Sequence, residues 1–285
     1  MCTSLFLLDD RSDLLLLLLF NRDEFFQRAT AEAHFWHDHQ ELLAGRDLVS
    51  SGTWLGITLT GRFALLTNFR EVAFNKIVNA PSRGALTADF LTGTQAPLAY
   101  LQGLPLEHHN GVNMVVGDLR TGRAAYATNR GPPGTVRGPR ELPRGLHALS
   151  NATLNEGWPK VTKARQRFEA LVEGGGLAGG PDGALPWDAL LHGVMGDAEL
   201  AAPAELPDTG LAPEMEHKMS AAFVAPWDHP GGQYGTRSQT ALAVWRDGRA
   251  ELHERYRSAD GAWRSVHHAF RIQLPGVSGA GAAAT

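Results

Sequence analysis

The sequence contains a single cysteine, Cys2, among its 285 residues. One cysteine cannot form a disulfide within the chain, so the fold must be stabilised by packing rather than by covalent cross-links. Proteins that work in reducing compartments share this property, because thiols there stay reduced. We therefore predict a cytoplasmic protein.

The sequence also lacks an apolar run long enough to cross a membrane. Its candidate, Leu14 to Phe20, is far shorter than the roughly 20 apolar residues that a transmembrane helix needs. The aspartates Asp9, Asp10 and Asp13 precede this run, and no small-residue cleavage pattern follows it, which argues against a secretory signal. We expect no integral membrane segment and interpret the run as a buried strand.

Neither sign of charge is in large excess. The chain carries 30 acidic and 26 basic side chains, which are interspersed and give a net charge of -4. Such a surface offers no positive field that would attract the phosphate backbone of DNA or RNA. We expect no nucleic-acid partner, and the sequence leaves the oligomeric state open.

Several common motifs of enzymes and metal proteins are absent. The sequence has neither a Gly-x-Ser-x-Gly nucleophile elbow nor a dinucleotide-binding fingerprint. The glycine-dense segment 174–180 lacks the Lys-Ser/Thr of a phosphate loop. The histidine-rich segments 34–39, 108–109 and 267–268 match no standard zinc pattern, and we interpret them as solvated or partner-facing loops. We predict no metal site.

What the sequence does contain is a series of hairpin patterns. The first two apolar segments, Thr3 to Leu8 and Leu14 to Phe20, flank a polar turn and predict a hairpin of buried strands. The same pattern of two strands around a turn recurs three times, at 53–68, 112–128 and 240–256. A further strand is predicted at 266–274.

Helical spacing separates these hairpins. It occurs at 86–91, 97–101, 158–172 and 186–195. Hairpins, then helices, then more hairpins favour an α+β fold whose antiparallel sheets carry helices on their outer faces. Two stacked sheets between two helix layers is one such solution. We predict a single domain over 1–275 and a disordered C-terminal tail over 276–285.

The position of the cysteine has a chemical consequence. Removal of Met1 by methionine aminopeptidase would leave Cys2 with a thiol and a free α-amine on one residue. An α-amine titrates near about 8, so it can accept the thiol proton at neutral pH, directly or through one water. The nucleophile would then carry its own base. The alternative is that Cys2 merely begins a strand.

A polar tetrapeptide, Asn21-Arg22-Asp23-Glu24, follows the second predicted strand. If the first two strands pair as a hairpin, it lies close to Cys2. Arg22 would then favour the thiolate, and Asp23 would hold or orient the α-ammonium through a charge-assisted hydrogen bond. The alternative is a solvated turn, which is common for four polar residues after an apolar strand.

These residues resemble the NRDE family, also called the transport and Golgi organisation protein two family. The resemblance rests on the N-terminal Met-Cys strand, the Asn-Arg-Asp-Glu tetrapeptide and five further motifs, which span nearly the whole chain in order. The five motifs are Gly52-Thr53-Trp54-Leu55-Gly56, Leu66-Thr67-Asn68, Asn129-Arg130-Gly131, Leu149-Ser150-Asn151-Ala152 and Tyr234-Gly235-Thr236-Arg237.

The resemblance implies both a fold and a set of site residues. The family is similar to the N-terminal-nucleophile (Ntn) hydrolases, whose fold is a four-layer αββα sandwich and whose better-known members cleave amide bonds in penicillins and bile-salt conjugates. Cys2 would be the nucleophile, with Arg22 and Asp23 as its electrostatic support and Arg237 as a basic residue that clamps a carboxylate or pairs with Asp23.

The resemblance further implies a pair of amide donors and a set of ligand contacts. Asn68 and Asn151 would bind the oxyanion of the tetrahedral intermediate, where one pre-aimed donor is worth about 3 kcal/mol. The residues expected to contact a ligand are Asn21, Trp54, Asn129 and Tyr234.

Two functions follow from this reading, and the sequence does not decide whether the protein is an enzyme. In the first, Cys2 attacks an amide or thioester of a small acyl substrate as an Ntn hydrolase or acyl transferase, which requires no cofactor. In the second, the same fold is a non-catalytic carrier of haem, an acyl lipid or acyl-CoA, with Cys2 or a histidine as an axial ligand when the cargo is haem. The family's associations with haem movement, lipid homeostasis and secretory-pathway organisation motivate the second.

Overall fold

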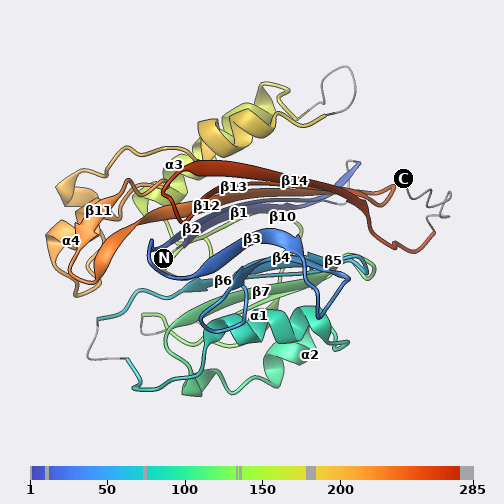
Figure 1. Cartoon of the computed structure of the whole chain (residues 1–285), viewed down its shortest axis with the longest axis horizontal. Helices are drawn as coiled ribbons and strands as arrows, with labels where there is room; N and C mark the ends of the chain where they lie inside the picture. The colour runs from blue at the N-terminus through green and yellow to red at the C-terminus, as the bar shows by residue number, and fades with distance from the viewer. Residues whose placement is uncertain are drawn as a thin grey trace.

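The computed structural model describes residues 2–9, 13–72, 76–132, 134, 137–177 and 184–276. Within these residues the strands form two seven-stranded antiparallel sheets. The sheets lie face to face, and helices cover the outer face of each (Figure 1). This arrangement is the four-layer αββα sandwich of the α+β class, which confirms the predicted fold.

The first sheet combines strands from both ends of the chain. Its order is β10-β1-β2-β12-β13-β14, and β11 pairs with one end of β12. Its strands are β1 (Cys2–Leu8), β2 (Leu14–Phe25), β10 (Gly145–Leu149), β11 (Trp227–His229), β12 (Gly232–Trp245), β13 (Arg249–Arg257) and β14 (Trp263–Arg271). Strand β2 is paired on both edges, with β1 and with β12, so it lies inside the sheet.

The second sheet follows the order of the chain from β3 to β9. Each strand pairs with the next one, as expected for a series of antiparallel connections. Its strands are β3 (Thr30–Phe35), β4 (Leu42–Asp47), β5 (Leu55–Thr58), β6 (Arg62–Asn68), β7 (Val112–Asp118), β8 (Arg123–Thr128) and β9 (Arg140–Glu141).

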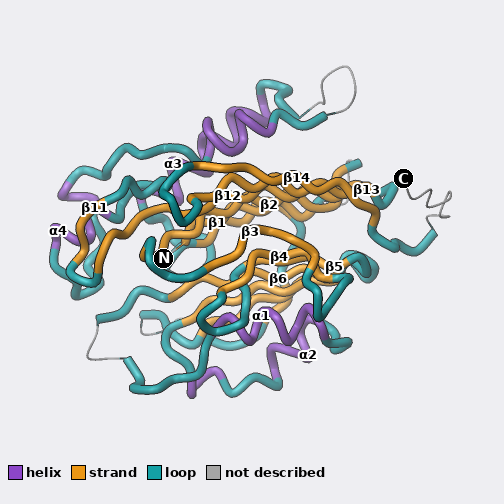
Figure 2. Tube along the Cα trace, in the orientation of Figure 1, coloured by secondary structure: helices purple, strands orange, loops and turns teal. Residues whose placement is uncertain are grey.

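The helices form the two outer layers (Figure 2). Helices α1 (Arg83–Thr92) and α2 (Pro97–Gln102) pack on the second sheet, and α3 (Pro159–Glu173) packs on the first with the π-helical segment η3 (Ala189–Val194). The remaining short segments are η2 (Leu106–His108), η4 (Pro203–Glu205) and α4 (Pro213–Lys218). Proline opens α2, α3 and α4, at the position where its missing N–H is harmless.

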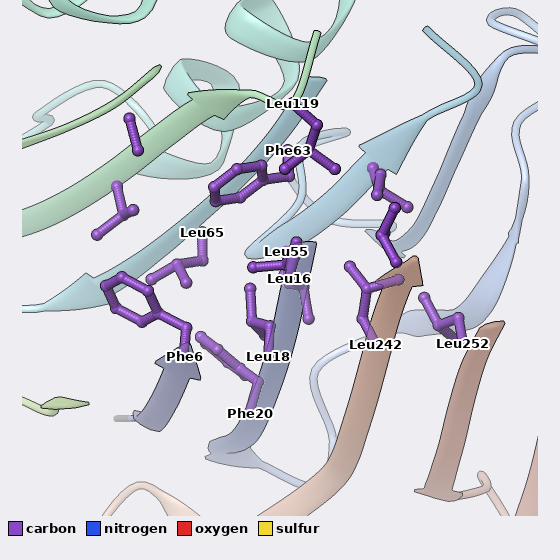
Figure 3. Packing of buried hydrophobic residues seen from close by; sticks show 14 of the residues in the cluster. Phe6, Leu16, Leu18, Phe20, Leu55, Phe63, Leu65, Leu119, Leu242 and Leu252 are labelled. Carbon is purple, nitrogen blue, oxygen red and sulfur yellow. The ribbon is translucent and has the colours of Figure 1, made fainter. Parts of the chain in front are cut away.

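The apolar side chains separate into layers that match the sheets. One cluster fills the space between the two sheets and includes Phe6, Leu18 and Phe63 (Figure 3). A second lies between the first sheet and α3, and a third between the second sheet and helices α1 and α2. Each sheet is therefore covered on both faces, which explains why its strands are apolar on both faces.

Strand β2 shows how a continuous apolar run becomes a central strand. Leu16, Leu18 and Phe20 point into the cluster between the sheets, whereas Leu17 and Leu19 point into the cluster under α3. Alternation by two along a strand produces this division. The predicted buried strand is confirmed, and among the described residues no helix has both the length and the apolar content needed to span a bilayer.

The predicted hairpins and helices are found close to their expected bounds. Strands β3, β4, β9, β10 and β11 were not predicted, because they are short and less regularly apolar. The interpretation of 34–39 as a loop is wrong at its start, because β3 includes His34 and Phe35 and the Trp36 indole is buried with its N–H donating to the Ala44 carbonyl at 3.1 Å. Residues 277–285 of the predicted tail lie outside the described residues.

One buried carboxyl joins the two sheets. Glu254 of β13 accepts hydrogen bonds from the backbone N–H of Ala33 at 2.8 Å and from the Thr240 hydroxyl at 3.0 Å. Burial raises the pKa of Glu254 to about 7, although both hydrogen bonds act to lower it. Because Ala33 belongs to the second sheet, this carboxyl is a polar link between the two sheets.

We predict that Glu254→Gln removes a pH-dependent component of stability. In the folded protein Glu254 keeps its proton up to pH about 7, whereas in the unfolded chain its pKa is about 4.5. The stability that this proton contributes is therefore fully present below pH 4.5 and is lost as the pH rises through 7. The variant should match wild type near pH 4.5 and exceed its free energy of unfolding by about 1–3 kcal/mol at pH 8. Urea unfolding at both pH values measures this, with the exposed Glu141→Gln as control. A difference that does not change with pH would contradict the assignment.

Candidate active site

Cys2 is the first residue of β1 and pairs directly with Arg22 of β2. Its side chain belongs to the cluster between the two sheets and is 6% exposed. The predicted proximity of Cys2 and the Asn-Arg-Asp-Glu tetrapeptide therefore exists in the structure, but the tetrapeptide is not a solvated turn. It lies within strand β2.

The surroundings of the thiol oppose its ionisation. Burial raises the pKa of Cys2, and the carboxylate of Asp23 raises it further, whereas Arg22 and a hydrogen bond with the backbone of Asp23 lower it. Because desolvation is the largest cause, the thiol is protonated at neutral pH. Any nucleophilic role of Cys2 therefore needs a nearby base to take this proton.

Arg22 points between the sheets, on the same side as the thiol. Its guanidinium lies over the Trp54 ring at 4.1 Å from the ring centroid. It also lies 3.9 Å from the Glu24 carboxylate and donates to the Thr30 hydroxyl at 3.4 Å. Stacking on an aromatic face suits the weakly hydrated, planar guanidinium, so Trp54 holds the cation beside Cys2.

Asp23 points to the opposite side of the sheet. Its carboxylate accepts a hydrogen bond from the Thr236 hydroxyl at 2.7 Å, and its backbone carbonyl accepts one from the Tyr234 hydroxyl at 3.2 Å. Burial raises the pKa of Asp23, and Lys160 and Arg70 counteract this. Strand alternation thus places Arg22 and the Asp23 carboxylate on different faces of β2, instead of side by side.

A cleft with a volume of about 310 Å³ opens next to Cys2. Its walls come from both sheets and from the beginning of α1, and most of the lining side chains are polar or charged. The lining residues are Cys2, Arg22, Asp23, Glu24, Arg28, Asp47, Ser50, Thr53, Trp54, Leu66, Asn68, Ala80, Pro81, Ser82, Arg83, Gly84 and Asn110. Cys2 is therefore mostly buried, but it borders the cleft on one side.

The two asparagines predicted to bind an oxyanion have different positions. Asn68, at the end of β6, lines the cleft. Asn151 is fully buried behind it and donates to the Asn68 carbonyl at 2.8 Å, while its own side-chain oxygen accepts from Ser150 at 3.2 Å and from Lys160 at 3.4 Å. Asn68 is thus placed to meet a ligand, and Asn151 is placed to position Asn68.

Three of the predicted ligand contacts lie away from this cleft. Asn21 faces the outer layer, where it donates to the carbonyls of Met195 and Ala222 at 2.8 and 2.7 Å. Asn129 fixes the loop before β7 by accepting from the Val112 N–H at 2.9 Å, and Tyr234 packs in a separate apolar cluster. Trp54 is the member of the predicted set that lines the cleft. These three residues were predicted from their motifs, but in the structure their side chains form hydrogen bonds with backbone groups.

Arg237 lies near Arg22 but binds a turn. It donates to the carbonyl oxygens of Phe25, at 3.2 Å, and Arg28. Burial lowers its pKa to about 10, and the charge of Arg22 adds to this effect. A bulge in β12, where Thr236 pairs with Asp23 and Ser238 with Arg22, turns Arg237 towards the space between the sheets. Instead of the predicted ion pair with Asp23, Arg237 forms hydrogen bonds with the turn between β2 and β3.

Three charged residues near the site were not predicted. Arg83, the first residue of α1, lines the cleft and donates to the Gly111 carbonyl at 2.8 Å. Lys160 is buried close to Asp23 and Cys2, and desolvation lowers its pKa to about 8. Arg70 pairs with the buried Glu216. They stand outside the shared motifs, so only the three-dimensional arrangement brings them together.

Comparisons with known proteins identify the family of the chain. The family model described as Transport and Golgi organisation 2 matches residues 1–259. The chain belongs to this family. The Bos taurus Transport and Golgi organization protein 2 homolog is 35% identical, covering 90% of this chain and 93% of its own, and the Homo sapiens homolog is 34% identical, covering 84% and 86%.

Solved structures with a distant likeness were also found. A conjugated bile acid hydrolase from Clostridium perfringens, in a mutant form, has a TM-score of 0.44 at 12% identity and covers 96% of this chain and 97% of its own. A Caenorhabditis elegans N-acylethanolamine-hydrolyzing acid amidase ortholog has a TM-score of 0.41 at 10% identity, covering 59% and 79%.

Gly52, in one of the family motifs, allows two backbone segments to meet beside the cleft. A Cβ atom at this position would lie 2.3 Å from the carbonyl carbon of Gly84 and 2.8 Å from the backbone nitrogen of Ala85. The neighbouring Thr53 N–H donates to the Gly84 carbonyl at 3.2 Å. This contact fixes the segment that carries Trp54 against the first turn of α1.

We predict that Gly52→Ala destabilises the protein by about 1–3 kcal/mol, because backbone atoms cannot move aside as a flexible side chain can. The midpoint of urea unfolding measures the change. Gly157→Ala is the matched control, because a Cβ atom there would meet its nearest neighbour, the Thr162 hydroxyl, at 3.9 Å. Equal midpoints for the two variants would show that the Gly52 contact is not needed.

Proposed function

We propose that this protein is an N-terminal-nucleophile hydrolase or acyl transferase that acts on an amide or thioester of a small acyl substrate. The observation that carries the proposal is the position of the Cys2 thiol in the wall of a polar cleft, beside Arg22 and Asn68. A volume of about 310 Å³ lies at the lower end of the range for small-molecule sites, which favours a small substrate. A cytoplasmic location is part of the proposal.

The proposed chemistry begins with removal of Met1. The α-amine of Cys2 takes the thiol proton, and the thiolate attacks the carbonyl carbon of the substrate. The oxyanion accepts a hydrogen bond from the Asn68 amide. As the carbon–nitrogen or carbon–sulfur bond breaks, the amine returns the proton to the leaving group and an acyl-thioester with Cys2 remains. Water, or another acceptor, then takes the acyl group and restores the thiol.

The raised pKa of the buried thiol is consistent with this scheme only if a base lies next to the sulfur. Burial penalises the thiolate, so an unprocessed chain would carry a protonated and unreactive Cys2. Removal of Met1 supplies the missing base on the same residue. Processing therefore acts as the activation step.

We predict that the isolated protein lacks Met1 and that Cys2 reacts with iodoacetamide at neutral pH. Intact-mass spectrometry reads both events, as the loss of one methionine residue and the gain of one carbamidomethyl group. Cys2→Ala is the matched control, because alanine also permits removal of Met1 but leaves no thiol to alkylate. A protein that retains Met1 and resists alkylation would contradict the catalytic proposal.

The arginines of the cleft indicate the polarity of the substrate. Arg28 pairs with Asp47 at 2.7 Å, and Arg22 lies near Glu24. Arg83 lines the same cleft and donates a hydrogen bond to a neutral carbonyl, that of Gly111. Its remaining N–H groups can therefore bind an anionic group of the substrate, such as a carboxylate.

We predict that Arg83→Gln selectively impairs substrates with a carboxylate in the leaving group. An N-acyl glycine and the N-acyl ethylamine with the same acyl group provide the comparison. Loss of a charge-assisted hydrogen bond, worth about 1.5–3 kcal/mol, should reduce kcat/KM for the first roughly 10- to 150-fold. The second should change little. The exposed Arg264→Gln serves as control, and equal losses for both substrates would refute the role.

A non-catalytic carrier of haem, an acyl lipid or acyl-CoA is the second candidate. The observation that favours it is the desolvated thiol, whose raised pKa makes Cys2 a poor nucleophile in the unprocessed chain. Titration with haemin, followed by its absorbance band, tests this candidate on wild type and Cys2→Ala. A saturable spectral change together with no hydrolysis of acyl amides would favour the carrier.

A further inference from the structure

A second cluster of chemically active side chains lies on the outer face of the first sheet, away from the Cys2 cleft. Strands β13 and β14 pair there, with His253 directly opposite His267. Glu251 is two residues before His253, so strand alternation places both on the same face. The residue between them, Leu252, points the other way, into the cluster between the sheets.

The three side chains bring their ligand atoms together. The Glu251 Oε2 atom lies 3.3 Å from Nε2 of His253 and 3.7 Å from Nε2 of His267. One ligand atom from each of the three lies within 4.8 Å of the others. Two atoms bound to one tetrahedral zinc at about 2.0–2.1 Å are roughly 3.3 Å apart, so little movement is needed to enclose an ion.

The imidazoles are held in place by stacking. The rings of His253 and His267 stack with centroids 4.0 Å apart, and the Trp187 ring stacks on His253 at 4.1 Å. Such contacts limit ring rotation, which keeps Nε2 of each histidine directed toward the carboxylate. The fold therefore holds the three ligand atoms close together before any ion binds.

The cluster is accessible to an ion from solvent. It borders a cleft of about 360 Å³ between β13, β14 and the segment around η3, which also includes His192 and Trp263. The His267 side chain is 51% exposed and that of His253 is 22% exposed. Three protein ligands beside an open cleft leave a fourth coordination position for water or a ligand.

From this geometry we propose that Glu251, His253 and His267 form a binding site for a divalent transition-metal ion, with Zn²⁺ as the expected occupant. Two imidazoles and one carboxylate match the ligand preference of Zn²⁺ and differ from the all-oxygen sets that Ca²⁺ and Mg²⁺ prefer. The site would join β13 and β14, the two strands at one edge of the sheet, independently of whether Cys2 is catalytic. It revises the sequence-based expectation that the chain has no metal site.

The test uses Zn²⁺ alone with the full chain, in competition with a chromophoric chelator. We expect one Zn²⁺ per chain in wild type and at least tenfold weaker binding in His253→Ala, His267→Ala and Glu251→Gln. His108→Ala is the control, because His108 is exposed and lies on η2, outside the first sheet. It should bind Zn²⁺ as wild type does.

Co²⁺ provides a second readout that does not depend on affinity. Tetrahedral Co²⁺ absorbs visible light far more strongly than octahedral aqueous Co²⁺, and we expect this intense band in wild type and its loss in Glu251→Gln. The conservative glutamine keeps size and polarity, so it separates loss of a ligand from loss of the fold. Absence of stoichiometric Zn²⁺ binding in wild type, or equal binding in all variants, would overturn the proposal.

Discussion

The pairing register of β1 and β2 is the constraint on which the site depends. Cys2 lies opposite Arg22, and the same register places Phe6 opposite Leu18 in the core between the sheets. Because side chains alternate with a period of two, a shift by one residue would exchange the side chains that face the two core layers and move the thiol to the outer layer. The burial of the leucine-rich strand therefore also sets the position of the thiol. The same strand register thus determines both the packing of the core and the geometry of the site.

Several charged side chains are buried together at one end of the sandwich. Arg70 and Glu216 pair there, and Lys160 and Asp23 lie close to them. Isolated buried charges are costly, but a group of opposite charges with hydrogen-bond partners is tolerated. These residues lie behind the cleft and surround the strand end that carries Cys2. Burial here also shifts pKa values from those in water, because desolvation lowers the pKa of Lys160 to about 8.

Much of the fold could be predicted from the sequence, because hairpins and amphipathic helices leave local patterns. The β12–β13 hairpin was found from its Asp-Gly turn, whereas β3 and β10 left no comparable pattern. Within the site, proximity of Cys2 to Arg22 followed from one hairpin. The positions of Asn151 and Arg237 could not be predicted in this way. That of Asn151 depends on packing behind the cleft, and that of Arg237 depends on the bulge in β12. Arg83 and the His253–His267 pair depend on contacts between distant segments, which no local spacing reveals.

The bulge in β12 has a wider consequence. Between Thr236 and Ser238 the strand contains one more residue than its partner β2. Thr236 and Arg237 therefore face different layers, and the residues after the bulge still point their apolar side chains into the core. Removing that extra residue would move every side chain on one side of the bulge to the opposite face of the sheet. The number of residues in this short stretch therefore matters as much as their chemistry. Relatives that keep the motif but change the spacing would need another way to hold the β2–β3 turn.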